Sequence, residues 1–133
     1  MDAGLSRSGN ACEPPSRLEF VLTMKLPNGD HADLGAKIEE YVLNPAHWEG
    51  RHKARVFESV LGITLANQGV LRDAILAAAT SSDEAQALGD NGHGDVYVLQ
   101  FPLVTVRNTA TVLTASIIRH EEDFARLITS YIL

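Results

Sequence analysis

Hydrophobic and polar residues alternate along the first apolar segment of the chain, residues 18–26. Every second position from 18 to 26 is apolar, namely Leu18, Phe20, Leu22, Met24 and Leu26. A period of two is typical of a strand that buries one face. Proline, asparagine, glycine and aspartate then follow at residues 27–30, and these residue types suit a turn. The pattern therefore predicts a strand over residues 18–26.

Three later segments have the spacing of a helix, in which apolar residues recur every three or four positions. Two of them cover residues 33–43 and 51–61, and the third begins at Asn67. Asp33 and Asn67 are residue types that cap the first turn of a helix. Gly62 suits the left-handed residue that follows a helix end.

The last third of the chain changes from helical to strand signals. Ser81 and Glu84 have the spacing of a capping box, which predicts a short fourth helical segment closed by Gly89. Beyond it, residue types that favour strands predict strands at 96–101, 110–119 and 127–133, with Pro102 at an end or an edge. Helices followed by consecutive strands predict an α+β fold. In this fold the N-terminal strand and the helices pack on one face of an antiparallel meander sheet.

Length and composition set the domain organisation. The 133 residues are 45% hydrophobic and 21% charged, which fits one globular domain and excludes a wholly disordered chain. Residues 1–17 are small and polar and include two prolines, so we expect a flexible N-terminal extension before a single domain over residues 18–133. One cysteine, Cys12, cannot form an internal disulfide, and no apolar run is long enough to cross a bilayer. These features predict a soluble cytoplasmic protein with no membrane partner.

The net charge of the chain and one local cluster of basic residues bear on the class of function. The net charge is −6, whereas a protein that simply coats nucleic acid is usually basic. A local basic cluster nevertheless occurs in the first turns of the second predicted helix, at Arg51, His52, Lys53 and Arg55. Cations at this end of a helix cost about 0.3–1 kcal/mol each, unless an anion binds there.

The same region carries a pattern that resembles a known family. Residues 43–57 read L-x-P-x-H-x-x-G-x-H-K-A-x-x-F, residues 101–103 read F-P-L, and residues 126–131 read R-L-x-[ST]-x-Y. The combination resembles a family of small bacterial domains of unknown function, over roughly residues 26–133. Helices followed by a meander sheet with a closing T-x-Y strand are also similar in architecture to metal-independent RNase toxins of the barnase, EndoU, colicin and RelE group.

That similarity implies RNA cleavage through the 2′-hydroxyl, which needs a base, an acid and positive charge on the phosphate. Histidine titrates near neutral pH and serves as base or acid, and Lys and Arg hold phosphate. The residues expected to be catalytic are His52, Lys53, Arg55, Thr129 and Tyr131, and those expected to bind substrate are His47, Arg51 and Arg126. Strict alternation puts Thr129 and Tyr131 on the strand face of Leu127, and Arg126 with Ser130 on the other. We expect the start of the second helix and the C-terminal strand to wall one hollow.

Plainer interpretations of these residues stay open. A basic cluster of this kind is most often a solvated helix face, and Thr129 and Tyr131 are residue types that are common in strands. The acidic net charge suits a non-enzymatic interaction module, such as an antitoxin, an immunity protein or an accessory domain that binds a protein partner through a sheet edge or the basic helix. A third hypothesis is a small-molecule pocket lined by Trp48, Tyr97 and Phe101.

Metal and cofactor chemistry has little support in the sequence. The histidines at 47, 52, 93 and 120 are scattered, and none has the spacing that directs two ligands at one ion. The loop that begins at Asp90 is like a calcium loop only in composition, because Phe101 occupies the position where glutamate is required. No glycine pattern for nucleotide cofactors occurs. We therefore expect neither a metal nor a cofactor.

Overall fold

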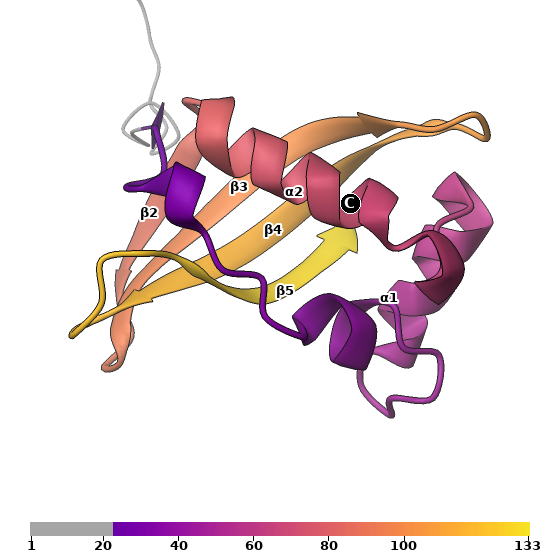
Figure 1. Ribbon diagram of the computed structural model, residues 1–133, viewed down its shortest axis with the longest axis horizontal. Helices are drawn as coiled ribbons and strands as arrows, with labels where there is room; N and C mark the ends of the chain where they lie inside the picture. The colour runs from indigo at the N-terminus through magenta and orange to yellow at the C-terminus, as the bar shows by residue number, and fades with distance from the viewer. Residues whose placement is uncertain (1–22) are drawn as a thin grey trace, which may run out of the picture.

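The computed structural model describes residues 23–133, and its centre is a five-stranded antiparallel sheet (Figure 1). The strands follow the order β1-β2-β3-β4-β5, so that each strand pairs with its neighbour along the chain. Their bounds are Thr23–Met24 for β1, Ala85–Asp90 for β2, Gly94–Val104 for β3, Thr109–Arg119 for β4 and Arg126–Ile132 for β5. This topology confirms the predicted α+β fold with an antiparallel meander.

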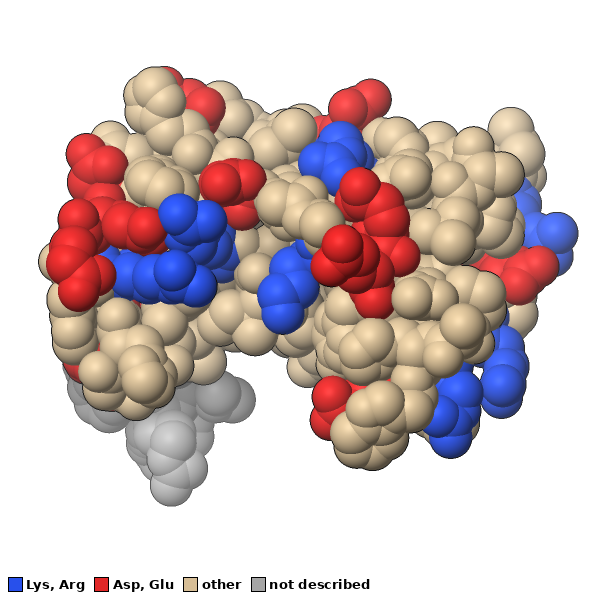
Figure 2. Space-filling model, turned by 60° about the horizontal axis from the view of Figure 1, so that its bottom comes forward, with Lys and Arg blue, Asp and Glu red and all other residues tan. Residues whose placement is uncertain are grey.

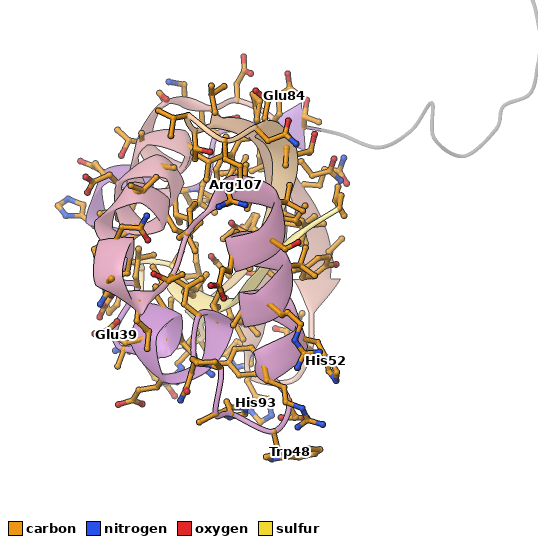
Figure 3. All side chains as sticks on the ribbon, turned by 90° about the vertical axis from the view of Figure 1, so that its right-hand side faces the viewer. Glu39, Trp48, His52, Glu84, His93 and Arg107 are labelled. Atoms are coloured by element: carbon orange, nitrogen blue, oxygen red, sulfur yellow. The ribbon has the colours of Figure 1, made fainter. Side chains whose placement is uncertain are left out.

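The helices lie on one side of this sheet, as Figures 1 and 3 show. They are η2 (Gly29–His31), η3 (Ile38–Val42), α1 (Arg51–Val56), η4 (Phe57–Leu61), η5 (Leu65–Asn67) and α2 (Gly69–Ser81). The predicted helix over residues 51–61 is formed by α1 and η4, which follow each other without a break. It ends at Gly62, whose φ of 71° is left-handed as expected.

The hydrophobic core lies between the helices and one face of the sheet. Phe57, Leu71 and Ile75 from the helices pack in one cluster with Leu99 of β3 and Val112 of β4. Each of these side chains is at most 5% exposed. Burial of such a side chain stabilises a fold by about 1.5–3 kcal/mol, so this layer holds the helices in place against the strands.

The predicted helix over residues 33–43 forms only in its second half, as η3. Asp33 does not cap it. The backbone of Asp33 bonds beside β5 instead, donating to Ala125 O at 2.8 Å and accepting from Leu127 N at 3.1 Å. Gly35 then takes a φ of 53°, which a right-handed helix excludes. The helix therefore begins three residues later, at Ile38.

The predicted fourth helical segment is wrong, because these residues form β2. Ala85 is fully buried and pairs with Met24, and the bond of Glu84 N to Ser82 Oγ at 3.1 Å replaces the expected capping box. Gly89 has a φ of 97° and lies at a bulge in β2 rather than at a helix end. A side chain buried by a neighbouring strand outweighs a weak local helix signal.

Two other sequence predictions need adjustment. Asn67 does not cap α2, because its side-chain oxygen accepts from Thr64 N at 2.7 Å and so closes the turn η5. Of the predicted strand over residues 18–26, the structure forms β1, and Leu26 just beyond it is buried. Residues 18–22 and the extension predicted over residues 1–17 lie outside the described residues.

Candidate functional site

The face of the sheet turned away from the helices carries a second set of apolar side chains. Val96 and Val98 of β3 lie opposite Ile117 and Ala115 of β4, and none of them belongs to the core cluster. Helices of the described part cover only the other face (Figure 3). We call this surface the open face, and it offers a ligand a platform that the core does not use.

A β-bulge in β5 decides which of its residues reach the open face. Thr129 and Tyr131 lie opposite Ala115 and Leu113, and after the bulge Arg126 lies opposite Ile117. Directly opposed residues of antiparallel strands share a face, so Arg126, Thr129 and Tyr131 share the open face. The prediction that Arg126 lies with Ser130, on the face opposite Thr129, is wrong, because the extra residue of a bulge shifts the alternation.

The core side of β5 is closed. Ser130 is fully buried, and its hydroxyl lies 3.2 Å from Thr114 Oγ1 and donates to Leu113 O at 3.1 Å. Leu127 shares this face and is 4% exposed. These residues anchor β5, which leaves chemistry on this strand to the open face.

Thr129 has an unusual environment. Within residues 23–133 its hydroxyl oxygen is inaccessible and has no hydrogen-bond partner. A buried hydroxyl without a partner costs about 1–3 kcal/mol. The open face therefore does not present this hydroxyl to solvent.

The second helix packs beside β5, but the hollow lined by Arg51 and Arg55 of α1 contains no residue of β5. The expectation that the helix start and the C-terminal strand wall that hollow together is therefore wrong. Both α1 and η3 pack against this strand.

His52 is exposed, and Figure 3 shows it at the outer edge of the molecule, opposite the edge at which Glu39 lies. Ala54 and Phe57 are buried residues of the same segment, so His52 points away from the core. An imidazole in this position is accessible to solvent.

Lys53 contacts Tyr41 of η3. Its ammonium donates to Tyr41 Oη at 3.0 Å and lies 5.1 Å from the centre of that ring. Lys37 lies 5.6 Å from the same ring centre. Two ammonium groups around one phenol make this corner of η3 and α1 attractive to an anion. No pattern of spacing pointed to Tyr41, because its partner is twelve residues away.

His47 holds the loop before α1. Its Nδ1 accepts hydrogen bonds from the backbone N–H groups of Glu49 and Gly50, both at 3.0 Å, and its ring packs edge-on against Tyr41 at 4.9 Å. An Nδ1 that accepts leaves the ring proton on Nε2. His47, expected to bind substrate, thus uses one ring nitrogen to position α1.

Gly50 explains the glycine of the sequence pattern. A Cβ at this position would lie 2.0 Å from the backbone oxygen of Tyr41. The close approach brings the start of α1 against η3, so that Lys53 reaches Tyr41.

The other two cations of the cluster lie on a different side of α1. Arg51, Arg55 and Glu58 line a hollow of about 330 Å³, and Arg51 also donates to the backbone oxygen of Trp48. A spacing of four and three residues places these side chains on one helix face. No residue of β5 lines this hollow, so the α1 cations do not all meet the strand.

Arg126 is engaged with carboxylates. Its guanidinium donates to both oxygens of Glu122 at 2.9 and 2.8 Å, lies 3.5 Å from Asp33 Oδ2, and stacks over Phe124 at 4.9 Å. The hydrogen bond from Arg126 lowers the pKa of Glu122, and the same bond raises the pKa of Arg126. These contacts join the start of β5 to neighbouring loops. They occupy most of the donors of Arg126 and leave few of them for a phosphate.

The face of the molecule drawn in Figure 2 shows no extended basic track. On this face, Lys and Arg lie among Asp and Glu rather than in a continuous stripe. Trp48 is 72% exposed on the loop before α1, whereas Phe101 is buried and Tyr97 packs against the core. The hypothesis of a pocket lined by these three aromatic residues is therefore wrong.

Within residues 23–133, no three His, Cys, Asp or Glu side chains come together in a way that could hold a metal ion. None of the helices in that part of the chain is long and apolar enough to cross a membrane.

Comparison with known proteins gives a family. The model of a family described as a domain of unknown function (DUF6883) matches residues 25–133. Neither the curated proteins nor the solved structures contain a match to the chain.

Proposed function

We propose that this chain, which belongs to the DUF6883 family of domains of unknown function, is a metal-independent endoribonuclease. The observation that supports it most is that one helix, α1, carries an exposed His52 next to the Lys53–Tyr41 pair. The imidazole and the ammonium supply the base and the positive charge that cleavage through a 2′-hydroxyl requires. Thr129 and Tyr131 lie on the face of β5 turned away from the helices (Figure 3), so the proposed reaction does not use them.

In the proposed reaction, His52 removes the proton of a ribose 2′-hydroxyl. The 2′-oxygen forms a bond to the adjacent phosphorus, and the bond from phosphorus to the 5′-oxygen breaks, which leaves a 2′,3′-cyclic phosphate. Water protonates the departing 5′-oxygen, and His52 returns its proton to solvent. Lys53 stabilises the charge on the phosphoryl oxygens.

The test is cleavage of RNA by the full chain in the presence of EDTA. Replacement of a general base lowers the rate by about 10²–10⁴-fold, so we expect His52→Ala to lose activity by that factor. His31→Ala is the matched control, because the His31 side chain is 72% exposed and lies outside α1 and β5. A substrate with a 2′-deoxyribose at the cut position should stay intact. Uncut RNA at high protein concentration, or equal cutting by His52→Ala, would refute the proposal.

A second candidate is a non-enzymatic module that neutralises a basic nuclease. The open face favours it, since half-buried Val96, Val98 and Leu113 form an apolar platform on a chain of net charge −6. Expression in bacteria separates the two candidates. A toxin suppresses growth, and His52→Ala relieves that suppression. A neutralising module leaves growth unchanged and forms a complex with a basic nuclease.

A further inference from the structure

The hollow on the Arg51 side of α1 is separate from the residues proposed to cut RNA. It lies between the loop before α1, one face of the helix and the turn η5. Its walls are mainly apolar or polar without charge, and three ionic side chains enter it. The lining residues are Leu43, Pro45, Arg51, Ala54, Arg55, Glu58, Thr64, Leu65 and Ala66. We call it the guanidinium hollow.

The charges of this hollow are only partly used by the protein. Arg51 is held by its hydrogen bond to the carbonyl of Trp48. Arg55 is exposed, and no ion pair joins it or Glu58 to another residue in the range 23–133. Arg72 and Arg126, in contrast, each contact a carboxylate at 2.8–2.9 Å. An unpaired guanidinium at the wall of a hollow is available to an anion from outside.

Size and chemistry together define the ligand. A volume of about 330 Å³ is within the range of small-molecule sites, which combine apolar walls with a few polar groups. A planar guanidinium matches two phosphate oxygens, and the apolar side chains of Leu43, Pro45 and Leu65 suit the face of a base. Glu58 adds one acceptor, which suits an N–H group on the edge of a base.

We infer that the guanidinium hollow binds a nucleoside monophosphate, either free or as one unit of an RNA chain. The phosphate lies at Arg55 and Arg51, and the base lies against the apolar wall. The link to RNA rests on the proposed function. The binding itself does not, because the hollow and the His52 side of α1 are different surfaces.

The experiment is an NMR titration of the isotope-labelled full chain with a nucleoside 5′-monophosphate, with the matching nucleoside, and with inorganic phosphate. We expect the monophosphate to shift the amide signals of residues 51–58 and 64–66, and to bind more tightly than either part alone. Arg55→Gln should weaken binding by about tenfold or more, the loss typical of a hydrogen bond to a charged group. A short RNA with a blocked 2′-position distinguishes a bound RNA unit from a free nucleotide.

Arg107→Gln is the matched control. Arg107 is also exposed and also lines a hollow, the one between the β3–β4 turn and Gly62, where it is the sole ionic lining residue. Equal weakening by both variants, equal binding by wild type and Arg55→Gln, or no shifts at about 1 mM ligand would overturn the inference. If the protein binds the monophosphate through Arg55 but cuts no RNA, nucleotide binding in the hollow is supported and the proposed nuclease activity is refuted. If it cuts RNA but does not bind the monophosphate in this way, the nuclease activity is supported and the inferred binding site is refuted.

Discussion

The two sides of α1 differ in how the protein uses their cations. On the side of η3, Lys53 is bound to Tyr41, and its place is secured by the close contact of Gly50 with η3. On the other side, Arg55 lines an open hollow and pairs with no carboxylate of the described residues. Successive helix positions turn by about 100°, so neighbours in the sequence point to different surroundings. A run of basic residues is therefore not one site, and each cation has to be judged by what it contacts.

The largest effect should come from Gly50→Ala, which disrupts the contact between α1 and η3. Its Cβ would fall 2.0 Å from the backbone oxygen of Tyr41, so the loop and η3 have to move apart. We expect the free energy of unfolding to fall by about 1–3 kcal/mol, as for other overpacked sites. Chemical denaturation measures this.

Gly69→Ala is the control for that change. Gly69 begins α2, and a Cβ there meets nothing within 4 Å. Alanine favours a helix over glycine by about 0.5–1 kcal/mol, so the unfolding free energy should stay equal or rise. Equal losses in the two variants would contradict the close contact at Gly50.

A smaller effect should separate Lys53 from Arg55. Lys53→Met removes the bond to Tyr41 and the contact with its ring, and should lower the unfolding free energy by about 1 kcal/mol. Arg55→Met removes a side chain without an ion pair in the described part, and should change it by less than about 0.5 kcal/mol. Thermal and urea unfolding of both variants would test this. Equal losses of unfolding free energy would contradict the proposed difference between the two sides of α1.

The smallest effect is a pH response that lies away from α1. His120 Nε2 lies 2.6 Å from Asp90 Oδ2, and this bond raises the pKa of His120 above its ordinary 6.5 and lowers that of Asp90 below its ordinary 3.8. The stabilisation by His120 is thus fully present below about pH 6.5, and it is lost as the pH rises through the raised pKa. The stabilisation by the Asp90 carboxylate is present above pH 3.8, and it is lost as the pH falls through the lowered pKa of Asp90.

NMR titration of the histidine side chains measures this directly. In the wild-type protein, His120 should titrate at a higher pH than 6.5, and Asp90→Asn should return it toward that ordinary value. The same substitution should also reduce the loss of thermal stability as the pH rises through the raised value. A wild-type His120 that titrates at or below 6.5 would show that the pair does not form in solution.

The sequence alone determined the features that depend on local periodicity. Alternation and β-branched residues marked β4 and β5, and the helical spacing of residues 51–61 together with Gly62 marked α1 and η4 and their end. These signals survive because neighbours along the chain create them. The structure also accounts for the glycine at position 50, because a Cβ there would collide with the backbone oxygen of Tyr41.

The tertiary structure alone decided the rest. The bulge in β5 moved Arg126 to the face of Thr129, and the bonds of Asp33 beside β5 delayed the start of η3. Ala85 became a strand residue because β1 and the core bury it, and Lys53 found Tyr41 across a loop. In each case the partner is distant in sequence, and the energy of that contact exceeds the small preference of the local residues.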